Sequence, residues 1–160
     1  MAHDLATVAP AFVEMAHSIV WCTAATVGTD GRPRTRILHP VWEWDGDSLT
    51  GWIATSPQSP KAADLAAHPQ VSLTYWRPEH DTCTADCDAE WTNDDESRRA
   101  GWDRFLHAPE PVGYDPSIIP VWPSPEAPAF GILRLHPTRL RVMPGSFMVA
   151  REGELHTWRR

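Results

Sequence analysis

Short apolar segments separated by turn-forming residues dominate the chain between Ile19 and Trp76. Their β-branched composition predicts four strands, over residues 19–27, 34–44, 48–56 and 70–76. Turn signals separate the first three, "GTDGRP" at residues 28–33 and "DGD" at residues 45–47. Two later segments, residues 83–91 and 130–143, also have strand patterns. Many short strands with few helices predict a mainly β protein built as a small barrel.

Three helices are expected beside these strands. Residues 4–18 have apolar side chains at helical spacing, with Asp4 as a possible N-cap. Residues 59–67 predict a short helix, and residues 94–106 predict another, with acids first and arginines later, as the helix dipole favours. The end, "FMVAREGELHTWRR", has the pattern of a hairpin that turns at Glu152 and Gly153.

Residues 78–128 differ from the rest because they are rich in Pro, Asp and Glu. We expect them to be an insertion within one domain that spans residues 1–160. The part from Ala108 to Pro128 has too many prolines for regular structure and should wrap the surface. Two roles stay open for it: shaping a substrate pocket or covering a dimer.

Composition excludes several classes of protein. Of the 160 residues, 42% are hydrophobic, which predicts a folded chain, and the formal net charge of −7 argues against a nucleic-acid partner. The sequence has no apolar run long enough for a membrane span and no pattern of a signal peptide. Three cysteines do not suggest a disulfide scaffold. We therefore expect a cytoplasmic protein.

Lys61 is the single lysine of the chain, beside thirteen arginines, and it lies in the first turn of the predicted helix 59–67. Ser59 can cap this helix and Pro60 fits its first position. The helix dipole opposes a cation there by roughly 0.3–1 kcal/mol. The same end binds anions through free backbone N–H groups, so an anion between them would explain the lysine.

A second cation is expected near the same place. Alternation puts Arg34, Arg36 and Leu38 on one face of their strand. If this strand pairs with the next one, Arg36 approaches Thr55. Two cations, several hydroxyl groups and a helix N-terminus together predict a phosphate site.

Here the sequence resembles a known family. The stretch "DGRPRTRILHPVWEWDGDSLTGWIATSPQSPKAADLAAHPQVSLTYW" (residues 30–76) is similar to the flavin-binding split barrels of the pyridoxamine 5′-phosphate oxidase-like family. A DG turn, an arginine-bearing strand, a strand ending in Thr-Ser and a helix opening with SPK occur in the family's order. "GILRLHPTRLRVM" (131–143) and the final "TWRR" resemble its late strand and C-terminal segment.

The resemblance implies a split β-barrel homodimer that binds FMN at the subunit interface. It assigns the phosphate to Arg36, Thr55, Ser56 and Lys61, and the edge of the isoalloxazine ring to the backbone of Ile37 and Leu38. It places Trp158 and Arg160 near the flavin of the partner subunit. The implied function is an FMN-dependent oxidoreductase that acts on a small molecule, whose identity the sequence does not give. The true oxidase is longer and carries further residues for pyridoxal phosphate, which argues against that substrate here.

Two alternatives are kept. One is a non-enzymatic carrier of flavin or haem on the same barrel. The other is a deazaflavin-dependent reductase, although the acidic tail of that coenzyme favours a basic groove, and the net charge of −7 opposes it.

We predict neither a disulfide nor a metal site at Cys83 and Cys87, which would lie ~13 Å apart on a strand. Cys22 is expected in the core. Among the histidines, His39 and His156 could reach a flavin pocket, but the sequence assigns neither.

Overall fold

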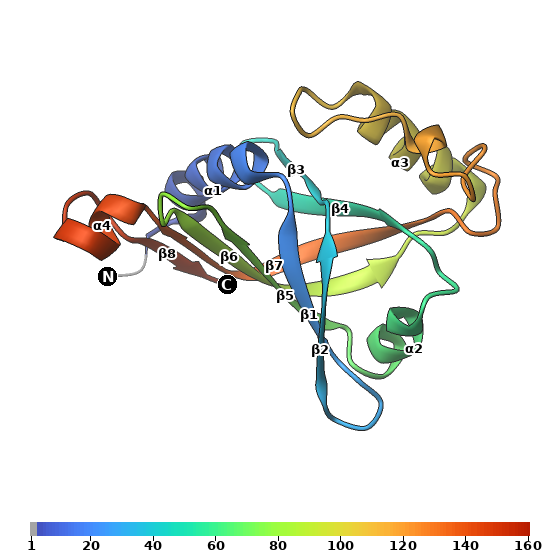
Figure 1. Cartoon of the computed structure of the whole chain (residues 1–160), viewed down its shortest axis with the longest axis horizontal. Coiled ribbons are helices and arrows are strands. Elements are labelled where there is room, and N and C mark those ends of the chain that lie inside the picture. The colour runs from blue at the N-terminus through green and yellow to red at the C-terminus, as the bar shows by residue number, and fades with distance from the viewer. Residues whose placement is uncertain (1–2) are drawn as a thin grey trace.

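The computed structural model describes residues 3–160 as one curved antiparallel sheet with helices around it (Figure 1). Its strands are β1 (Cys22–Val27), β2 (Pro33–Leu38), β3 (Val41–Trp44), β4 (Leu49–Thr55), β5 (Gln70–Trp76), β6 (Thr82–Trp91), β7 (Gly131–Met143) and β8 (His156–Arg159). Its helices are α1 (Leu5–Ile19), α2 (Pro60–Ala67), α3 (Asp95–His107), α4 (Gly145–Ala150) and the 3₁₀ turn η1 (Pro116–Ile118).

The strand order closes the sheet. Neighbouring strands run β2-β1-β5-β6-β7-β4-β3, and β8 pairs with β7. The two end strands, β2 and β3, are consecutive in the chain and are joined by His39 and Pro40 alone. Such a link spans at most about 11 Å, so the sheet must curl until its ends meet. Within residues 3–160 no ladder joins β2 to β3. The structure therefore confirms the predicted split β-barrel.

The strand predicted over residues 34–44 is two strands, and this corrects the sequence analysis. Pro40 has no N–H to donate to a ladder, so pairing changes at this point. β2 pairs with β1, whereas β3 pairs with β4. The condition on which the approach of Arg36 to Thr55 was expected, pairing of the arginine-bearing strand with the strand that ends at Thr55, is therefore not met.

Helix α1 covers the main core with one face. Its apolar face buries Val8, Ala9, Phe12 and Ala16, which pack into the main core. The predicted N-cap is confirmed, because the Asp4 carboxylate accepts a hydrogen bond of 2.7 Å from the backbone N–H of Thr7.

Trp42 of β3 ties this helix to the sheet. Its indole Nε1–H donates to the Tyr75 hydroxyl at 2.8 Å, and Phe12 packs edge-on against its ring at 4.9 Å. Its backbone N–H donates to Nε2 of His17, on α1, at 2.9 Å. Nε2 can accept this bond only when it carries no proton, and burial lowers the pKa of His17. Neutral His17 therefore belongs to the folded state.

The insertion expected over residues 78–128 is wrong in its first part, because residues 82–91 form the barrel strand β6 between β5 and β7. Residues 94–128, called the insertion from here on, build a second core on the outside of the barrel. The predicted helix at residues 94–106 is confirmed as α3, capped by the Asp94 carboxylate. The segment from Ala108 to Pro128 has only the short turn η1, as its prolines predicted. Its Val112 and Trp122 are nevertheless buried, and they pack with Phe105, Phe130 and Ile132. The insertion is therefore a packed layer.

The C-terminal hairpin predicted around Glu152 and Gly153 is wrong. Residues 145–150 form helix α4, and β8 pairs with β7. Strand β7 has thirteen residues, and β4 covers one edge of it only over Gly131–Leu135. The backbone of Arg139–Val142 on that edge still needs hydrogen-bond partners, and β8 supplies them.

All three cysteines are buried free thiols. Cys83 and Cys87 face the interior from β6, and no disulfide joins them, as predicted. Burial raises the pKa of all three thiols, that of Cys22 to about 12. Among the described helices, none has both the length and the apolar character that a membrane crossing requires.

Replacing His17 by Ala should lower the free energy of unfolding by about 1–3 kcal/mol, because the buried Trp42 N–H loses its acceptor. In the wild type, the unfolded chain binds a proton at His17 more readily than the folded chain does. This contribution to stability is complete above the ordinary pKa of about 6.5 and is lost as the pH falls below it. Urea unfolding at pH 7.5 and 5.0 measures both effects.

The variant should therefore show a weaker loss of stability on acidification than the wild type. His107→Ala, at an exposed end of α3, is the matched control and should keep the wild-type pH dependence. An unchanged pH dependence in His17→Ala would contradict the assignment.

Candidate functional site

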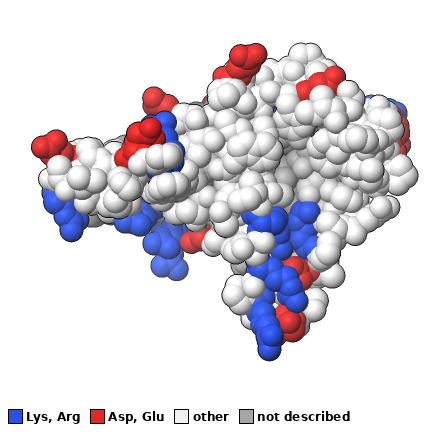
Figure 2. Space-filling view, in the orientation of Figure 1, with Lys and Arg blue, Asp and Glu red and all other residues white. Residues whose placement is uncertain are grey.

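Cationic side chains gather where β2 meets α2. Figure 2 shows Lys and Arg atoms along the β1–β2 hairpin and beside α2. Strand β2 carries Arg34 and Arg36, and the first turn of α2 carries Lys61. The two elements are joined by one acid, Asp64 of α2, which is buried.

Asp64 lies close to both arginines, while Arg34 donates its direct hydrogen bonds to Asp30, at 3.0 and 3.2 Å. The closest guanidinium nitrogens of Arg34 and Arg36 lie 3.8 Å from the two carboxylate oxygens of Asp64, and the buried Thr26 hydroxyl donates to this carboxylate at 3.2 Å. Arg36 also donates to the carbonyl of Ala24 at 3.3 Å. The guanidinium of Arg36 is thus held from two sides.

Lys61 has a hydroxyl neighbour but no acid. Its Nζ donates to Ser59 Oγ at 2.8 Å, and that hydroxyl donates to the carbonyl of Ser56 at 2.7 Å. Within residues 3–160 no carboxylate lies within 4 Å of this Nζ. Burial lowers the pKa of Lys61, and the positive charge of Arg36 lowers it further. An anion placed beside Lys61 and Arg36 would relieve this repulsion.

A largely apolar pocket of about 460 Å³ adjoins these cations. Its volume is typical of small-molecule sites. It is lined by Val20, Trp21, Ile37, Leu38, His39, Ala54, Thr55, Pro111, Gly113, Tyr114, Ile118, Ile119 and Trp122.

The chain runs directly from the pocket to the cations at two points. Arg36 precedes Ile37 and Leu38 on β2, and Thr55 at the end of β4 leads to Ser56 and Lys61. Because β2 is an end strand, it pairs through one edge, with β1. Its other edge leaves backbone N–H and C=O groups for a ligand. The arrangement suits a molecule with a flat ring at one end and an anionic group at the other.

Aromatic side chains surround His39 in the pocket wall. Its ring centroid lies 4.9 Å from that of Trp21 and 5.0 Å from that of Tyr114. Burial lowers the pKa of His39, more than its hydrogen bond to the backbone of Val112 raises it. The imidazole is therefore neutral at pH 7.

The turn that presents Trp21 has a strained backbone. Val20 ends α1 with φ of 74° and ψ of −63°, and the N–H of Trp21 donates to the carbonyl of Ile19 at 2.9 Å. This is a γ-turn, which is rare and unfavourable for a β-branched residue. Strain of this kind is concentrated at ligand sites.

The structure brings six of the eight sequence-predicted residues to one region, namely Arg36, Ile37, Leu38, Thr55, Ser56 and Lys61. The two others lie on or after β8. Trp158 pairs with Leu140, and Arg160 contacts Asp88 at 3.1 Å. Their predicted role concerns the partner subunit and stays a prediction.

Sequence reasoning missed Asp64 and the aromatic wall. Asp64 lies three residues after Lys61, on the same helical face, and this spacing was the available signal. Tyr114 and Trp122 lie far along the chain, in a segment without periodicity, so no local pattern could place them in the pocket.

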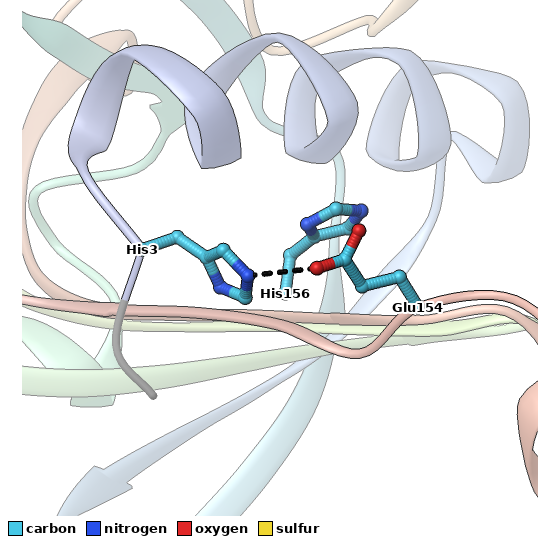
Figure 3. A group of neighbouring side chains, drawn as sticks. All are labelled: His3, Glu154 and His156. Carbon is cyan, nitrogen blue, oxygen red and sulfur yellow. Dashed lines mark hydrogen bonds and ion pairs between the residues drawn. The ribbon is translucent and has the colours of Figure 1, made fainter.

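A second cluster lies between the start of α1 and β8, where His3, Glu154 and His156 point toward one another (Figure 3). His3 Nε2 is 3.0 Å from the Glu154 carboxylate, and His3 Nδ1 accepts from the backbone N–H of Thr157 at 3.2 Å. An imidazole that accepts at Nδ1 carries its proton at Nε2, so it donates to Glu154. The contact therefore ties the N-terminal segment to β8 by hydrogen bonds.

Comparison with known proteins identifies the fold and the family. The family model for pyridoxamine 5′-phosphate oxidase matches residues 8–143. None of the curated proteins compared with the chain matches it by sequence.

Solved structures share the fold at low sequence identity. A Clostridium acetobutylicum protein related to general stress protein 26 is 14% identical, with a TM-score of 0.67 over 91% of this chain and 89% of that chain. A Nostoc punctiforme FMN-binding protein related to the oxidase is 17% identical, with a TM-score of 0.64 over 95% and 94%. A Mycobacterium smegmatis haem-binding protein is 19% identical, with a TM-score of 0.60 over 99% of this chain and 60% of that chain.

The match covers most of the chain, and the neighbours share its strand-rich fold. The protein belongs to the pyridoxamine 5′-phosphate oxidase family.

Proposed function

We propose that the protein is an FMN-dependent oxidoreductase. The observation that carries the proposal is the pair of cations Arg36 and Lys61, one of them without an acidic partner, beside a pocket able to take a flat ring. FMN combines a phosphate and a planar ring system in one molecule. The neighbour from Nostoc punctiforme binds FMN, which supports the same cofactor here.

The residues present fit this cofactor. Arg36, Lys61 and the Thr55–Ser56 hydroxyl groups would hold the phosphate. The free edge of β2 at Ile37 and Leu38 would meet the polar edge of the ring, while apolar side chains exclude water from it. FMN, when bound, supplies hydride or single-electron transfer, so no side chain of the protein needs to act as nucleophile.

The complete site is proposed to need two copies of the chain. Trp21 and Ile37, at the pocket, are large apolar residues that stay exposed in a single chain. Apolar surface of this kind marks an interface. A homodimer would cover it, and Trp158 and Arg160 of the partner would approach the flavin.

A haem carrier is the second candidate. The Mycobacterium smegmatis neighbour binds haem, and His39 Nε2 is a buried nitrogen that finds no hydrogen-bond partner among residues 3–160. A deazaflavin coenzyme is less compatible, because its acidic tail would meet a chain of net charge −7.

The absorbance spectrum of the purified protein distinguishes these candidates, because flavin, deazaflavin and haem absorb differently. Turnover of reduced nicotinamide with an added acceptor then separates an enzyme from a carrier. A haem spectrum that is lost on His39→Phe would replace the FMN proposal by the carrier.

Replacing Lys61 by Met should weaken FMN binding by about 1.5–3 kcal/mol, or roughly ten- to a hundredfold, the scale of a hydrogen bond to a charged group. Riboflavin has the same ring without phosphate, so its affinity should barely change. Fluorescence titration of the apoprotein with both ligands gives the ratio of affinities that tests the assignment.

Arg36→Met should change the same ratio, since it is assigned to the same phosphate. Arg99→Met removes an exposed arginine that pairs with Glu126, and as the matched control it should leave the ratio unaltered. If Lys61→Met binds FMN and riboflavin as the wild type does, the phosphate is held elsewhere.

The cofactor-loaded protein should have about twice the 17.9 kDa mass of the chain in solution. Light scattering at micromolar concentration, with FMN saturating, measures this mass. A monomer under these conditions would be incompatible with an interface cofactor site.

A further inference from the structure

The pocket has two unlike sides. One is β2, with Ile37 and Leu38, along which the proposed function places the flavin ring. The other is the insertion, which contributes Pro111, Gly113, Tyr114, Ile118, Ile119 and Trp122. If the flavin ring lies along β2, the insertion side is left to contact a second molecule, the substrate. A ligand role for the insertion side therefore rests on the proposed function.

The pocket carries no formal charge. None of its lining residues is Lys, Arg, Asp or Glu. Its two titratable groups are neutral at pH 7, since burial lowers the pKa of His39 and raises that of Tyr114 to about 12. An ionised ligand would lose its hydration here without gaining a partner, which is costly.

Tyr114 supplies a polar group on this side. Its ring packs 5.0 Å from His39 and 5.4 Å from Phe105, and its backbone N–H donates to the carbonyl of Phe105 at 2.9 Å. The ring is thus fixed, yet within residues 3–160 its hydroxyl makes no hydrogen bond and is not sealed from solvent. A phenol that stays protonated donates a hydrogen bond.

We propose that the insertion side binds a flat, uncharged aromatic molecule whose carbonyl oxygen accepts a hydrogen bond from Tyr114, as a quinone does. Tyr114 and Trp122 both line the pocket and bound the ligand with aromatic edges on this side. Pyridoxal phosphate and other anions are poor ligands of this side, because the cations Arg36 and Lys61 lie outside the pocket lining.

Three probes of similar shape test the proposal on the FMN-loaded protein. They are 2-methyl-1,4-naphthoquinone, the anionic 1,4-naphthoquinone-2-sulfonate and 2-methylnaphthalene, which has no oxygen. Calorimetric or fluorescence titration should show the neutral quinone binding roughly tenfold or more tightly than the sulfonate. A sulfonate that binds as well as the neutral quinone would overturn the proposal.

Tyr114→Phe removes only the hydroxyl. It should weaken the neutral quinone about three- to tenfold and leave 2-methylnaphthalene unchanged, the effect of one lost hydrogen bond. Equal weakening of both probes would show that Tyr114 is merely a packing residue and would refute its role as donor.

A matched pair of lysine variants tests which face is used. Ile118 and Val121 are 70% and 61% exposed on the same segment, but only Ile118 lines the pocket. Ile118→Lys should therefore improve binding of the sulfonate, and Val121→Lys should not. Equal effects of the two lysines would place the ligand elsewhere.

FMN affinity is measured in each variant as well. If the wild-type protein does not bind FMN, the proposed function itself is contradicted. Normal FMN binding with a preference for the sulfonate would contradict only the quinone site on the insertion side.

Discussion

The connection through His39 and Pro40 is the constraint on which the rest of the structure depends. It joins strands that lie at opposite ends of the strand order, so an open sheet is geometrically impossible. Closure creates an interior, and α1 packs Phe12 and its apolar neighbours against it. The hydrogen bond from Trp42, two residues after Pro40, to His17 fastens the helix to the strand that begins there.

The same closure also produces the site. Because the barrel is split between β2 and β3, β2 keeps one unpaired edge beside the end of β4. The arginines of β2 then face α2, where the buried Asp64 lies between them. A buried carboxylate is favourable only with nearby opposite charge and hydrogen bonds, and here it has two guanidinium groups and the Thr26 hydroxyl. Asp64 balances part of the positive charge of the two arginines. The charge of Lys61 has no carboxylate beside it among residues 3–160, and an anion can pair with it.

Local patterns predicted the elements of this fold well but not all of their pairings. The N-cap of α1 and the bounds of β5 follow from neighbouring residues, and the structure confirms them. Pro40 was also a local signal, because a residue without an N–H cannot donate to a strand ladder. The predicted strand 34–44 ignored this signal and joined β2 and β3 into one strand. The pairing of β8 with β7 depends on how far β4 extends along β7, which is a tertiary property. For the candidate site, the order of the motifs along the sequence predicted that Arg36 and Lys61 belong to it.

The opposite wall of the pocket comes from residues 111–122, whose position depends on packing against Phe105 and Phe130. That packing holds the part of the insertion that lines the pocket in a fixed position. Val112 and Trp122 are anchored in the second core, and the indole N–H of Trp122 donates to the carbonyl of Ala129 at 2.8 Å. The insertion side of the pocket is therefore held by its own hydrophobic core and by this hydrogen bond. The groups assigned to the phosphate come from β2, β4 and α2, and none of them is among the hydrophobic residues of this second core, although Ala54, the neighbour of Thr55 on β4, packs against it. Substitutions in residues 108–128 can therefore change the ligand on the insertion side while Arg36, Asp64 and Lys61 keep their geometry. The ligand proposed for the insertion side and the phosphate proposed for Arg36 and Lys61 therefore depend on different residues, although β4 adjoins both.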